Sequence, residues 1–483
     1  MDDQRANSNP PWWKDAGLRK LNFFLLSCYL GAISNGYGSS LITNLIADPR
    51  WFQDISGVDN SKLLGLVTAA HSLGGVAAFF PAPLISEKFG RRAGITFGSV
   101  CTMGGLVGQI FCRSFDQFLA TRLAIGFGST INTVSSSALL IELAHPRQRA
   151  VLGAMLNTCW FLGSTVAAWT SYGALHIRAS WSWRLPVAVQ LSWAVIQLGI
   201  LFFCPESPRW LVRNNMPEMA KRILTEHHSN GRVNDPLVEV ELSTMLLTKD
   251  IPRSQSSWSA LYATSGNRKR LLLSVVIGIA TQWVGNGIIT FYLPPVLQTV
   301  GIESPHHQQG INGGLQIYSW LLALCAALLA EKAGRRRLLL LSACTMLLFM
   351  VLVTACSAAY VSTRSVAAGY AVVVFLFLFL GGYVIGLTPI PVLYVNEVWP
   401  SHLRTKGSSV FWVVQAIAVC FNQFVNPVAL GKIGWKYYLV YVGVLVFFII
   451  FVFLFVPETK RLSLQEIEIL FDDRFPGRDS PGI

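Results

Sequence analysis

Neutral amide side chains lie inside the long apolar segments of this sequence, where polar groups are otherwise rare. One amide both donates and accepts hydrogen bonds. A group of them therefore suits a small molecule with several hydroxyl groups, whose removal from water would otherwise cost on the order of several kcal/mol. Each amide has an alternative role as a structural hydrogen bond between helices. These residues are Asn35, Gln109, Asn132, Asn157, Gln197, Gln282, Asn286, Gln316, Gln415, Asn422, Gln423 and Asn426.

Aromatic side chains near these amides would give such a ligand an apolar surface to lie against. Tyr292 and Trp412 are the candidates, although most of the 15 tryptophans are expected in the core or at a membrane interface. Asn422 and Asn426 are four residues apart and therefore lie on one face of a helix. For this pair the binding role and the structural role both stay open.

Arg122 is the one unambiguous charge deep inside an apolar segment. Placing an arginine at the centre of a membrane helix costs about 2.5–3.5 kcal/mol on insertion scales, so it should face the protein interior and have a partner. Backbone carbonyls and amides such as Asn35 could satisfy it. The other reading is a proton-coupling pair with a carboxylate, but the first apolar segment contains no Asp or Glu.

Acids and arginines occur in three short patterns, each of which is present twice. The separations between the copies are 244, 255 and 252 residues, and copies at near-equal separations indicate two parallel halves. At the ends of neighbouring segments such residues could pair when a transport path closes and separate when it opens. The alternative is that they only fix the topology. The set comprises Glu87, Arg91, Arg92, Glu142, Arg149, Glu206, Arg209, Glu331, Arg335, Arg336, Glu397, Arg404 and Glu458.

The elements that must position these residues are apolar segments long enough to cross a membrane. The 483-residue chain is 52% hydrophobic and only 13% charged, half the charge of a typical soluble chain. This composition excludes a disordered protein, a nucleic-acid-binding domain and an ordinary cytosolic enzyme. Segments of about 20 apolar residues lie near 22–45, 63–84, 94–111, 118–140, 150–173, 185–203, 271–297, 311–330, 338–360, 368–394, 407–430 and 437–456. We therefore predict an all-α membrane protein with twelve transmembrane helices.

The distribution of Lys and Arg predicts how the chain is oriented in the membrane. Of the 38 Lys and Arg residues, 29 fall on the side of both termini and eight on the other, so the positive-inside rule places both termini in the cytoplasm. The predicted parts are a cytoplasmic tail (1–21), a six-helix bundle (22–203), a cytoplasmic helical linker (204–270), a second six-helix bundle (271–456) and a cytoplasmic tail (457–483).

The seventh segment is interrupted by Gly285-Asn286-Gly287 and by Pro294-Pro295. Backbone groups freed at such a break are tolerated only where protein or a water-filled cavity satisfies them. A broken helix of this kind points to a transport site, and a packing kink is the alternative. The tenth segment, with Gly381-Gly382, Gly386, Pro389 and Pro391, has the same character.

Further motifs flank these segments: Trp183-Arg184-Leu185-Pro186, Pro205-Glu206-Ser207-Pro208-Arg209-Trp210-Leu211, Glu397-Val398-Trp399-Pro400 and Pro457-Glu458-Thr459-Lys460. With them the chain resembles the sugar porter family of the major facilitator superfamily. It is most similar to the fungal lactose permease and cellodextrin transporter branch. The branch match rests on Asn35-Gly36-Tyr37, on the stretches 157–163, 282–287 and 422–427, and on Gly434-Trp435-Lys436-Tyr437-Tyr438.

The resemblance implies a monomeric carrier that moves a sugar by alternating access, with Gln282, Asn286 and Asn157 facing a central cavity. The chain also departs from the family pattern. Proton-coupled members have an Asp where this chain has Gly38, and Thr281 replaces the first of two glutamines. Ser319, Val392 and Glu87-Lys88 are further departures.

We therefore expect a carrier for a hexose, pentose or disaccharide that works by facilitation. Proton-coupled symport and export of a fungal secondary metabolite are the alternatives. No enzyme motif is present, and the nine cysteines contain no CxxC pair, so we expect no metal or cofactor. A sugar receptor is disfavoured because only 23 residues follow Lys460. The expected partners are the substrate and the lipid bilayer of the plasma membrane, with protons left open and no nucleic acid.

Overall fold

The computed structural model describes residues 12–55, 60–232, 235–249, 258–400, 403–460, 462 and 464–471. Every regular element in these residues is a helix. A short helix, η1 (Trp12–Lys14), precedes the first half of the chain. That half, the N half, contains α2 (Ala16–Ile46), α3 (Pro49–Asp54), α4 (Ser61–Ala78), α5 (Pro81–Lys88), α6 (Arg91–Phe111), α7 (Phe115–Leu143), α8 (Arg149–Ala174) and α9 (Trp181–Phe203).

Short helices then connect the halves, and a second bundle, the C half, follows. The connecting helices are α10 (Pro208–Arg213), α11 (Pro217–His228), α12 (Pro236–Lys249) and α13 (Ala260–Ala263). The C half contains α14 (Ser265–Trp283), α15 (Asn286–Gln298), α16 (Pro305–Ala333), α17 (Arg335–Thr363), α18 (Val366–Gly386), α19 (Ile390–Val398), α20 (Arg404–Ile433), η3 (Gly434–Tyr437) and α21 (Tyr438–Phe455), and α22 (Leu464–Phe471) follows it.

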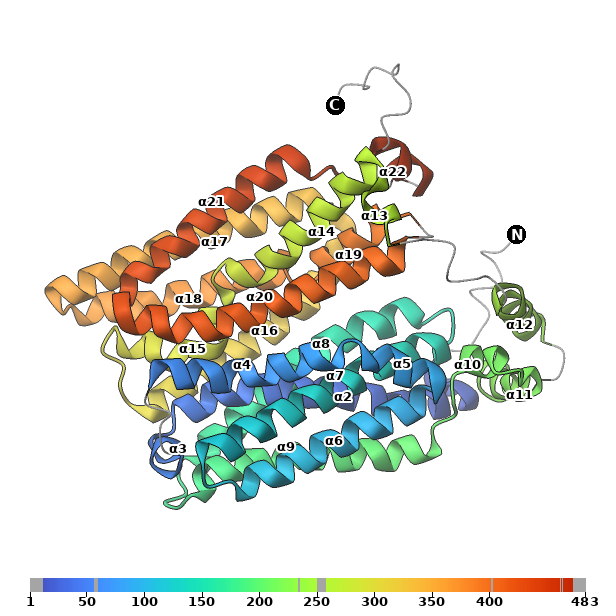
Figure 1. Ribbon diagram of the computed structural model, residues 1–483, viewed down its shortest axis with the longest axis horizontal. Coiled ribbons are helices and arrows are strands. Elements are labelled where there is room, and N and C mark those ends of the chain that lie inside the picture. Colours follow the sequence, from blue (N-terminus) through green and yellow to red (C-terminus); the bar gives the residue numbers. More distant parts are fainter. Residues whose placement is uncertain are drawn as a thin grey trace.

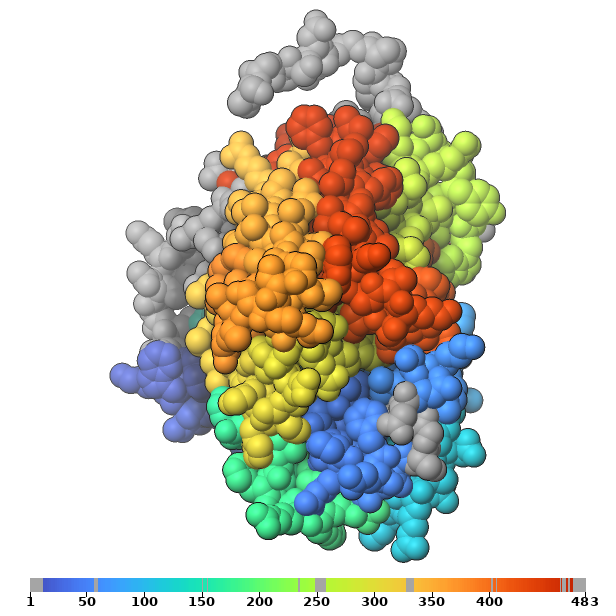
Figure 2. Space-filling view, turned by 90° about the vertical axis from the view of Figure 1, so that its left-hand side faces the viewer, coloured from blue at the N-terminus to red at the C-terminus, as the bar shows by residue number. Residues whose placement is uncertain are grey.

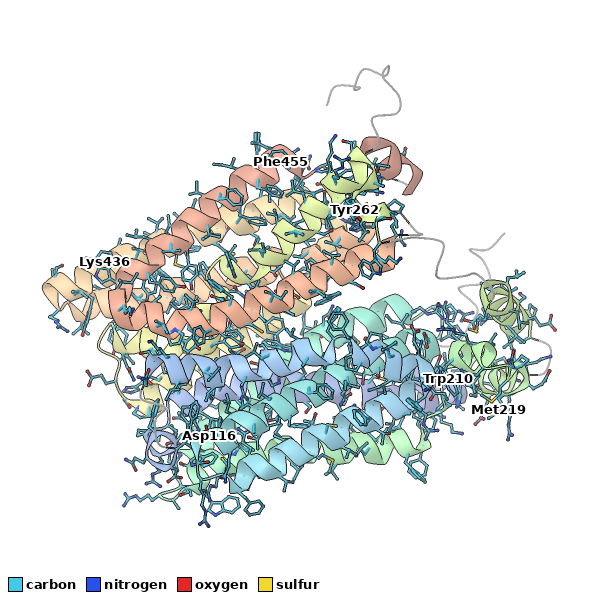
Figure 3. The ribbon with its side chains drawn as sticks, in the orientation of Figure 1. Asp116, Trp210, Met219, Tyr262, Lys436 and Phe455 are labelled. Atoms are coloured by element: carbon cyan, nitrogen blue, oxygen red, sulfur yellow. The ribbon has the colours of Figure 1, made fainter. Side chains whose placement is uncertain are left out.

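The two halves lie side by side as separate bundles, blue to green and yellow to red in Figure 1. The helices α10–α12 and α22 lie at one end of the molecule, which we call the linker end. Trp210 and Met219 mark this end in Figure 3, and Asp116 and Lys436 mark the opposite one.

Among the described residues, eight helical stretches are long and apolar enough to cross a membrane, or nine if the bent pair α4 and α5 forms one span. One of these stretches, Lys406–Phe455, is two helices, because the chain turns at Gly434 between α20 and α21. The long helices α2 and α16 also belong to the bundles; polar residues such as Asn35 lower the hydropathy of α2, and residues 327–333 of α16 have side chains outside the described set. Each of the twelve predicted segments is present as one helix or as two consecutive helices, and the predicted fold class is confirmed.

The breaks predicted in the seventh and tenth segments are present. The seventh span is divided into α14 and α15 at Gly285, and the tenth into α18 and α19 around Pro389. Gly285 has a φ of 104°, a left-handed conformation that favours glycine. The prolines of α15 lie inside the helix, and Tyr292 just before them has non-helical backbone angles. Both breaks therefore follow from local Gly and Pro chemistry.

The halves are held together at the end opposite the linker end, which we call the closed end. Thr43 Oγ1 donates to the carbonyl oxygen of Thr290 over 2.6 Å, and Asn312 Nδ2 donates to Asn44 Oδ1 over 2.8 Å. Figure 2 looks onto this end and shows the yellow segment of α15 and α16 between the two halves. From there the bundles diverge toward the linker end (Figure 1).

Close backbone contact between α2 and α8 explains two glycines of the branch motifs. A Cβ at Gly36 would overlap the carbonyl group of Trp160, and one at Gly163 would overlap that of Ile33. Small residues allow membrane helices to approach this closely. These two motif positions therefore serve packing within the N half.

Candidate functional site

Asn286 occupies the break in the seventh span as the first residue of α15. Its side chain is 7% exposed, and its Oδ1 atom has no hydrogen-bond partner among the described residues. A buried amide oxygen without a partner costs about 1–3 kcal/mol, so such an atom calls for a ligand or water. Asn286 thus has spare hydrogen-bonding capacity at the break.

Asn422 and Gln282 lie next to this break. Asn422 Nδ2 donates to the backbone carbonyl oxygen of Gln282 over 2.8 Å, which satisfies one of the groups freed at the end of α14. A Cβ at Gly287 would collide with the Asn422 amide, so glycine allows this approach. The side chain of Gln282 is half-buried. The structure therefore brings Gln282, Asn286 and Asn422 together.

Five further residues form contacts next to this group. Gln415 Nε2 donates to Thr281 Oγ1 over 3.0 Å, and Tyr383 Oη donates to the backbone carbonyl oxygen of Thr281 over 3.0 Å. The rings of Trp283 and Phe421 have centroids 5.0 Å apart. Sequence reasoning did not select Tyr383, Trp283 or Phe421, because aromatics are too numerous in this chain for position alone to distinguish them.

The other predicted substrate residues are placed differently. Tyr292 is buried, and its hydroxyl donates to the backbone carbonyl oxygen of Gln423, so it joins α15 to α20. Trp412 on α20 is 44% exposed, and Asn157 on α8 of the N half is exposed. The contacts of the described residues thus leave these three outside the Asn286 group.

Arg122 lies buried in the N half beside the first span. Its Nη1 atom donates to the backbone carbonyl oxygen of Gly38 over 3.3 Å. Asn35 instead donates to Thr133 Oγ1 over 2.9 Å. No carboxylate forms an ion pair with Arg122 within the described part of the chain. His71, on the second span, is the nearby ionisable group that sequence reasoning missed; its Nε2 atom is 3.4 Å from Ser129 Oγ.

The acids and arginines of the N half form one network at the linker end. Arg91 makes a bidentate pair with Glu142, with Nε–Oε2 and Nη2–Oε1 distances of 2.9 and 3.0 Å. The Ser207 hydroxyl donates to Glu142. Glu206 accepts the backbone N–H groups of Arg91 and Arg92 at the start of α6, where a helix favours negative charge. Burial raises the pKa of Glu206, and these N–H groups act against that shift.

The C half repeats this network. Arg335 Nη2 donates to Glu397 Oε1 over 2.6 Å, and Thr459 Oγ1 donates to Glu397 Oε2 over 2.7 Å. Glu458 accepts the backbone N–H of Arg335 over 2.8 Å at the start of α17. Gly90 and Gly334, with φ of 104° and 92°, precede the two helices, and a Cβ there would press on Glu206 or Glu458. Both networks lie within their own half.

The remaining gating candidates have separate surroundings. Arg92 and Arg336 donate to the backbone carbonyl oxygens of Phe202 and Phe453, over 3.0 and 2.6 Å. Other contacts link Glu87 to Arg213 at 3.6 Å and Arg149 to Glu241 of α12 at 3.5 Å, while Arg209 adds positive charge near Glu142. Arg404 has two buried nitrogens without a partner in the described chain. The side chain of Glu331 lies outside the described residues.

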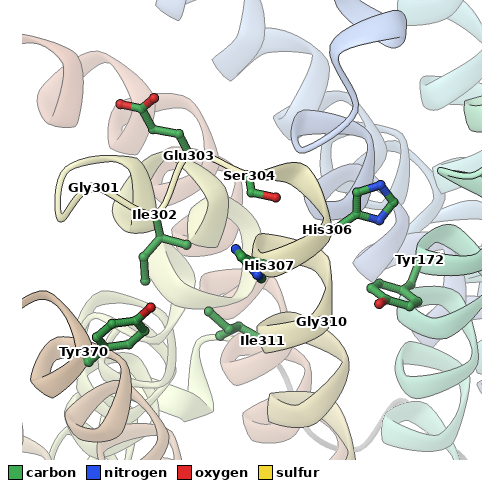
Figure 4. A pocket seen from close by; sticks show the side chains of 10 residues that line it. All are labelled: Tyr172, Gly301, Ile302, Glu303, Ser304, His306, His307, Gly310, Ile311 and Tyr370. Atoms are coloured by element: carbon green, nitrogen blue, oxygen red, sulfur yellow. The ribbon is translucent and has the colours of Figure 1, made fainter. Parts of the chain in front are cut away.

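A cavity of about 550 Å³ lies at the closed end and was not predicted from the sequence (Figure 4). Tyr172 of α8 lines it from the N half, and Tyr370 and residues 301–311 line it from the C half. The rings of His176 and His306, one from each half, have centroids 5.1 Å apart. This cavity is separate from the Asn286 group. Among the described residues no three His, Cys, Asp or Glu side chains are grouped to hold a metal ion.

A family model described as "Sugar (and other) transporter" matches residues 25–471. The chain belongs to this family. Similar proteins include the MFS-type transporter oryC of Aspergillus oryzae, 27% identical over 90% of this chain and 82% of that protein. Hexose transporter HXT8 of Saccharomyces cerevisiae is 26% identical over 94% of this chain and 82% of that protein.

The sugar transporter family assignment agrees with the fold. The structure is similar to the inward-open conformation of the xylose transporter XylE from E. coli, with a TM-score of 0.78, 21% identity, and coverage of 94% of this chain and all of that one. The protein therefore has the major facilitator fold and is a multi-pass membrane transporter of a small molecule, not an enzyme.

Proposed function

We propose that this protein carries a sugar across a membrane by alternating access, with the Asn286 group as part of its substrate site. The observation that carries the proposal is the buried, unpartnered Oδ1 of Asn286 at the broken seventh span. Gln282 and Asn422 add donors and acceptors beside it, and the Trp283–Phe421 pair adds an apolar surface. This combination suits a ring of hydroxyls with apolar faces.

The orientation and the conformational state follow from charge and contacts. We assign the linker end to the cytoplasm, because 29 of 38 Lys and Arg residues fall on that side. Since the halves touch at the opposite end, this conformation is then inward-facing. Transport requires the Thr43–Thr290 and Asn44–Asn312 contacts to break while the linker end closes.

The acid and arginine networks act as the cytoplasmic gate in this proposal. Each network joins two spans of its own half through a buried or half-buried ion pair. Such pairs fix the shape of the helix ends that must meet when the cytoplasmic side closes. Arg404, with two unpartnered nitrogens in this conformation, is able to gain a partner on closure.

The proposed mode is facilitation. Arg122 Nη1 donates to the Gly38 carbonyl, its Nε atom has no partner, and no carboxylate forms an ion pair with it among the described residues. Uptake should then persist when the proton gradient is collapsed. We further propose a monomer in the plasma membrane that takes a hexose, pentose or disaccharide. The residues that resemble the lactose permease and cellodextrin branch support inclusion of the disaccharide, and the hexose transporter relatives support the hexose.

Export of a secondary metabolite is the second candidate. It is favoured by the pairing of Thr281 with Gln415, which engages two side chains that could otherwise bind a sugar.

Counterflow in proteoliposomes with labelled glucose, xylose, lactose and cellobiose tests the proposal. We expect one of these sugars to exchange, and Asn286→Ala and Gln282→Ala to abolish exchange. Gln298→Ala is the matched control, because Gln298 is the exposed last residue of the same broken span. Normal exchange by both site variants would overturn the site, and no exchange of any of the four sugars would favour the metabolite exporter.

A further inference from the structure

Two neighbouring histidines join the linker helices to the N half. His228 is the last residue of α11, and His145 lies in the connection between α7 and α8. Both are buried, and their ring centroids are 5.0 Å apart. We call His145, His228, Glu241 and Arg149 the histidine latch. Its four members come from α11, α12, the start of α8 and the connection before it.

The hydrogen bonds of His228 require a charged ring. Its Nδ1 atom is 2.7 Å from Glu241 Oε2, and its Nε2 atom is 3.2 Å from the backbone carbonyl oxygen of Leu143. Both partners only accept, so each ring nitrogen must carry a proton. The side chain is 1% exposed, so a neutral ring would leave one buried acceptor without a donor. Leu143 ends α7, where the helix dipole also favours a cation.

The hydrogen bond of His145 requires a neutral ring. Its Nδ1 atom accepts the backbone N–H of Arg147 over 3.3 Å, so that nitrogen carries no proton. Burial, followed by the charges of His228 and Arg147, lowers the pKa of His145 to about 4. A neutral imidazole therefore lies beside a charged one.

Glu241 contacts both His228 and Arg149. Its Oε1 atom is 3.5 Å from Arg149 Nη2, while its Oε2 atom accepts from His228. Arg149 Nη2 also donates to the backbone carbonyl oxygen of Ala144 over 3.2 Å. Among the other ionisable groups, Asp15 before α2 faces His145 and His227 faces His228, while Lys20 of α2 and Glu226 of α11 lie beside His227. The latch thus connects the linker helices to the first residue of α8.

We propose that His228 is a pH-dependent positioning residue, which as an imidazolium holds Glu241 against Arg149 and keeps α11 and α12 docked on the N half. Histidine changes charge between about pH 5 and pH 8. Loss of one of the two ring protons leaves either Glu241 or the Leu143 carbonyl without its donor. Docking therefore weakens as the pH rises.

His145 has the opposite effect on docking. Because its pKa is lowered on docking, the docked state disfavours its protonation, and docking weakens as the pH falls below about 6.5, the ordinary histidine value. The proposed role of His228 and the lowered pKa of His145 thus act in opposite directions on one contact. The influence on the transport rate rests on the proposed gating role of Arg149, whereas the docking itself does not depend on the proposed function.

Hydrogen exchange on the purified protein, without any substrate, measures the docking. Protection factors of the α11 and α12 peptides are compared at about pH 6 and about pH 8, which removes the intrinsic pH dependence of exchange. In His145→Gln we expect protection to fall clearly from pH 6 to pH 8. The wild-type fall should be about fourfold smaller, because His145 opposes it.

The matched variant is His228→Gln, in which His145 and His227 keep the pKa values that burial lowers. Its protection should rise at least about fourfold from pH 6 to pH 8, the reverse of the trend in His145→Gln. A flat or rising profile in His145→Gln would overturn the proposal, even if His228→Gln does not fold. A profile in His228→Gln that still falls would also overturn it, because another group would then carry the charge. Exchange profiles that match these expectations uphold the latch whether or not sugar counterflow is found.

Discussion

The two halves contain the same ion-pair network but differ in how deeply it is buried and in which helices pack beside it. In the N half the side chains of Arg91 and Glu142 are 8% and 14% exposed, and in the C half those of Arg335 and Glu397 are 17% and 26% exposed. The linker helices cover the N half, where Glu241 pairs with Arg149. Among the described residues, Arg404 has two unpartnered nitrogens, whereas its counterpart Arg149 has one.

The difference shows that two copies of a repeat can form the same ion pairs while the helices packed around each copy differ. The N half is stabilised by its own network and by the linker helices docked on it. The C half has a more exposed pair and an arginine with unused donors. We therefore expect the N half to be the fixed side of the gate and the C half the side that forms new contacts on closure.

The largest expected effect separates the two pairs by stability. Glu142→Ala leaves Arg91 buried without its carboxylate and should cost about 3 kcal/mol of unfolding free energy, the range for a broken buried pair. Glu397→Ala should cost about half as much, because water reaches Arg335 more easily. Thermal unfolding in detergent measures both. Equal losses would mean that the linker helices do not distinguish the halves.

A second test separates gating from binding. Arg335→Ala and Arg91→Ala should slow substrate exchange about tenfold or more, equal to about 1.4 kcal/mol in the barrier, with little change in affinity. Counterflow rates and equilibrium binding to the same purified variants are the two measurements. Weaker binding with unchanged exchange rates would show that neither arginine belongs to a gate.

A third test asks whether a carboxylate beside Arg122, the buried charge of the N half, changes transport. Gly38→Asp places a carboxylate beside Arg122 and should make exchange pH-dependent by about threefold or stall it, since an Asp–Arg pair that keeps its charge favours one state. A Cβ at Gly38 would lie 2.5 Å from Gln190 Nε2, so the double variant with Gln190→Ala supplies the room. Wild-type accumulation that an uncoupler abolishes would contradict native facilitation.

The smallest expected effect is at the surface contact between α2 and α11. Lys20 Nζ is 2.6 Å from Glu226 Oε1, and both side chains are about half exposed. The hydrogen bond from Lys20 lowers the pKa of Glu226, so its contribution is present above about pH 4.5 and is lost as the pH falls further. Glu226→Gln should cost less than about 1 kcal/mol at neutral pH. A larger loss of α11 protection in hydrogen exchange would show that this pair, and not the histidine latch, holds the linker helices.

Local features of the sequence predicted the spans, the helix breaks and the placement of the repeated motifs. The spans follow from apolar length, and the breaks at Gly285 and around Pro389 follow from Gly and Pro chemistry. The repeated motifs predicted which acids and arginines share an end of the bundle. The motifs did not predict which acid pairs with which arginine; the structure pairs Arg91 with Glu142 and Arg335 with Glu397.

The sequence by itself determined the family, the spans, the repeat and the set of candidate polar residues. Only the tertiary structure decided which of them have free hydrogen-bonding groups. It left Asn286 Oδ1 without a partner, gave Arg122 the carbonyl of Gly38 and joined Asn35 to Thr133. The charged His228 beside the neutral His145 also appears only in the folded chain. The physical reason is that apolar length and backbone breaks are local properties, whereas a hydrogen-bond partner or a burial cost depends on atoms brought together from distant parts of the chain.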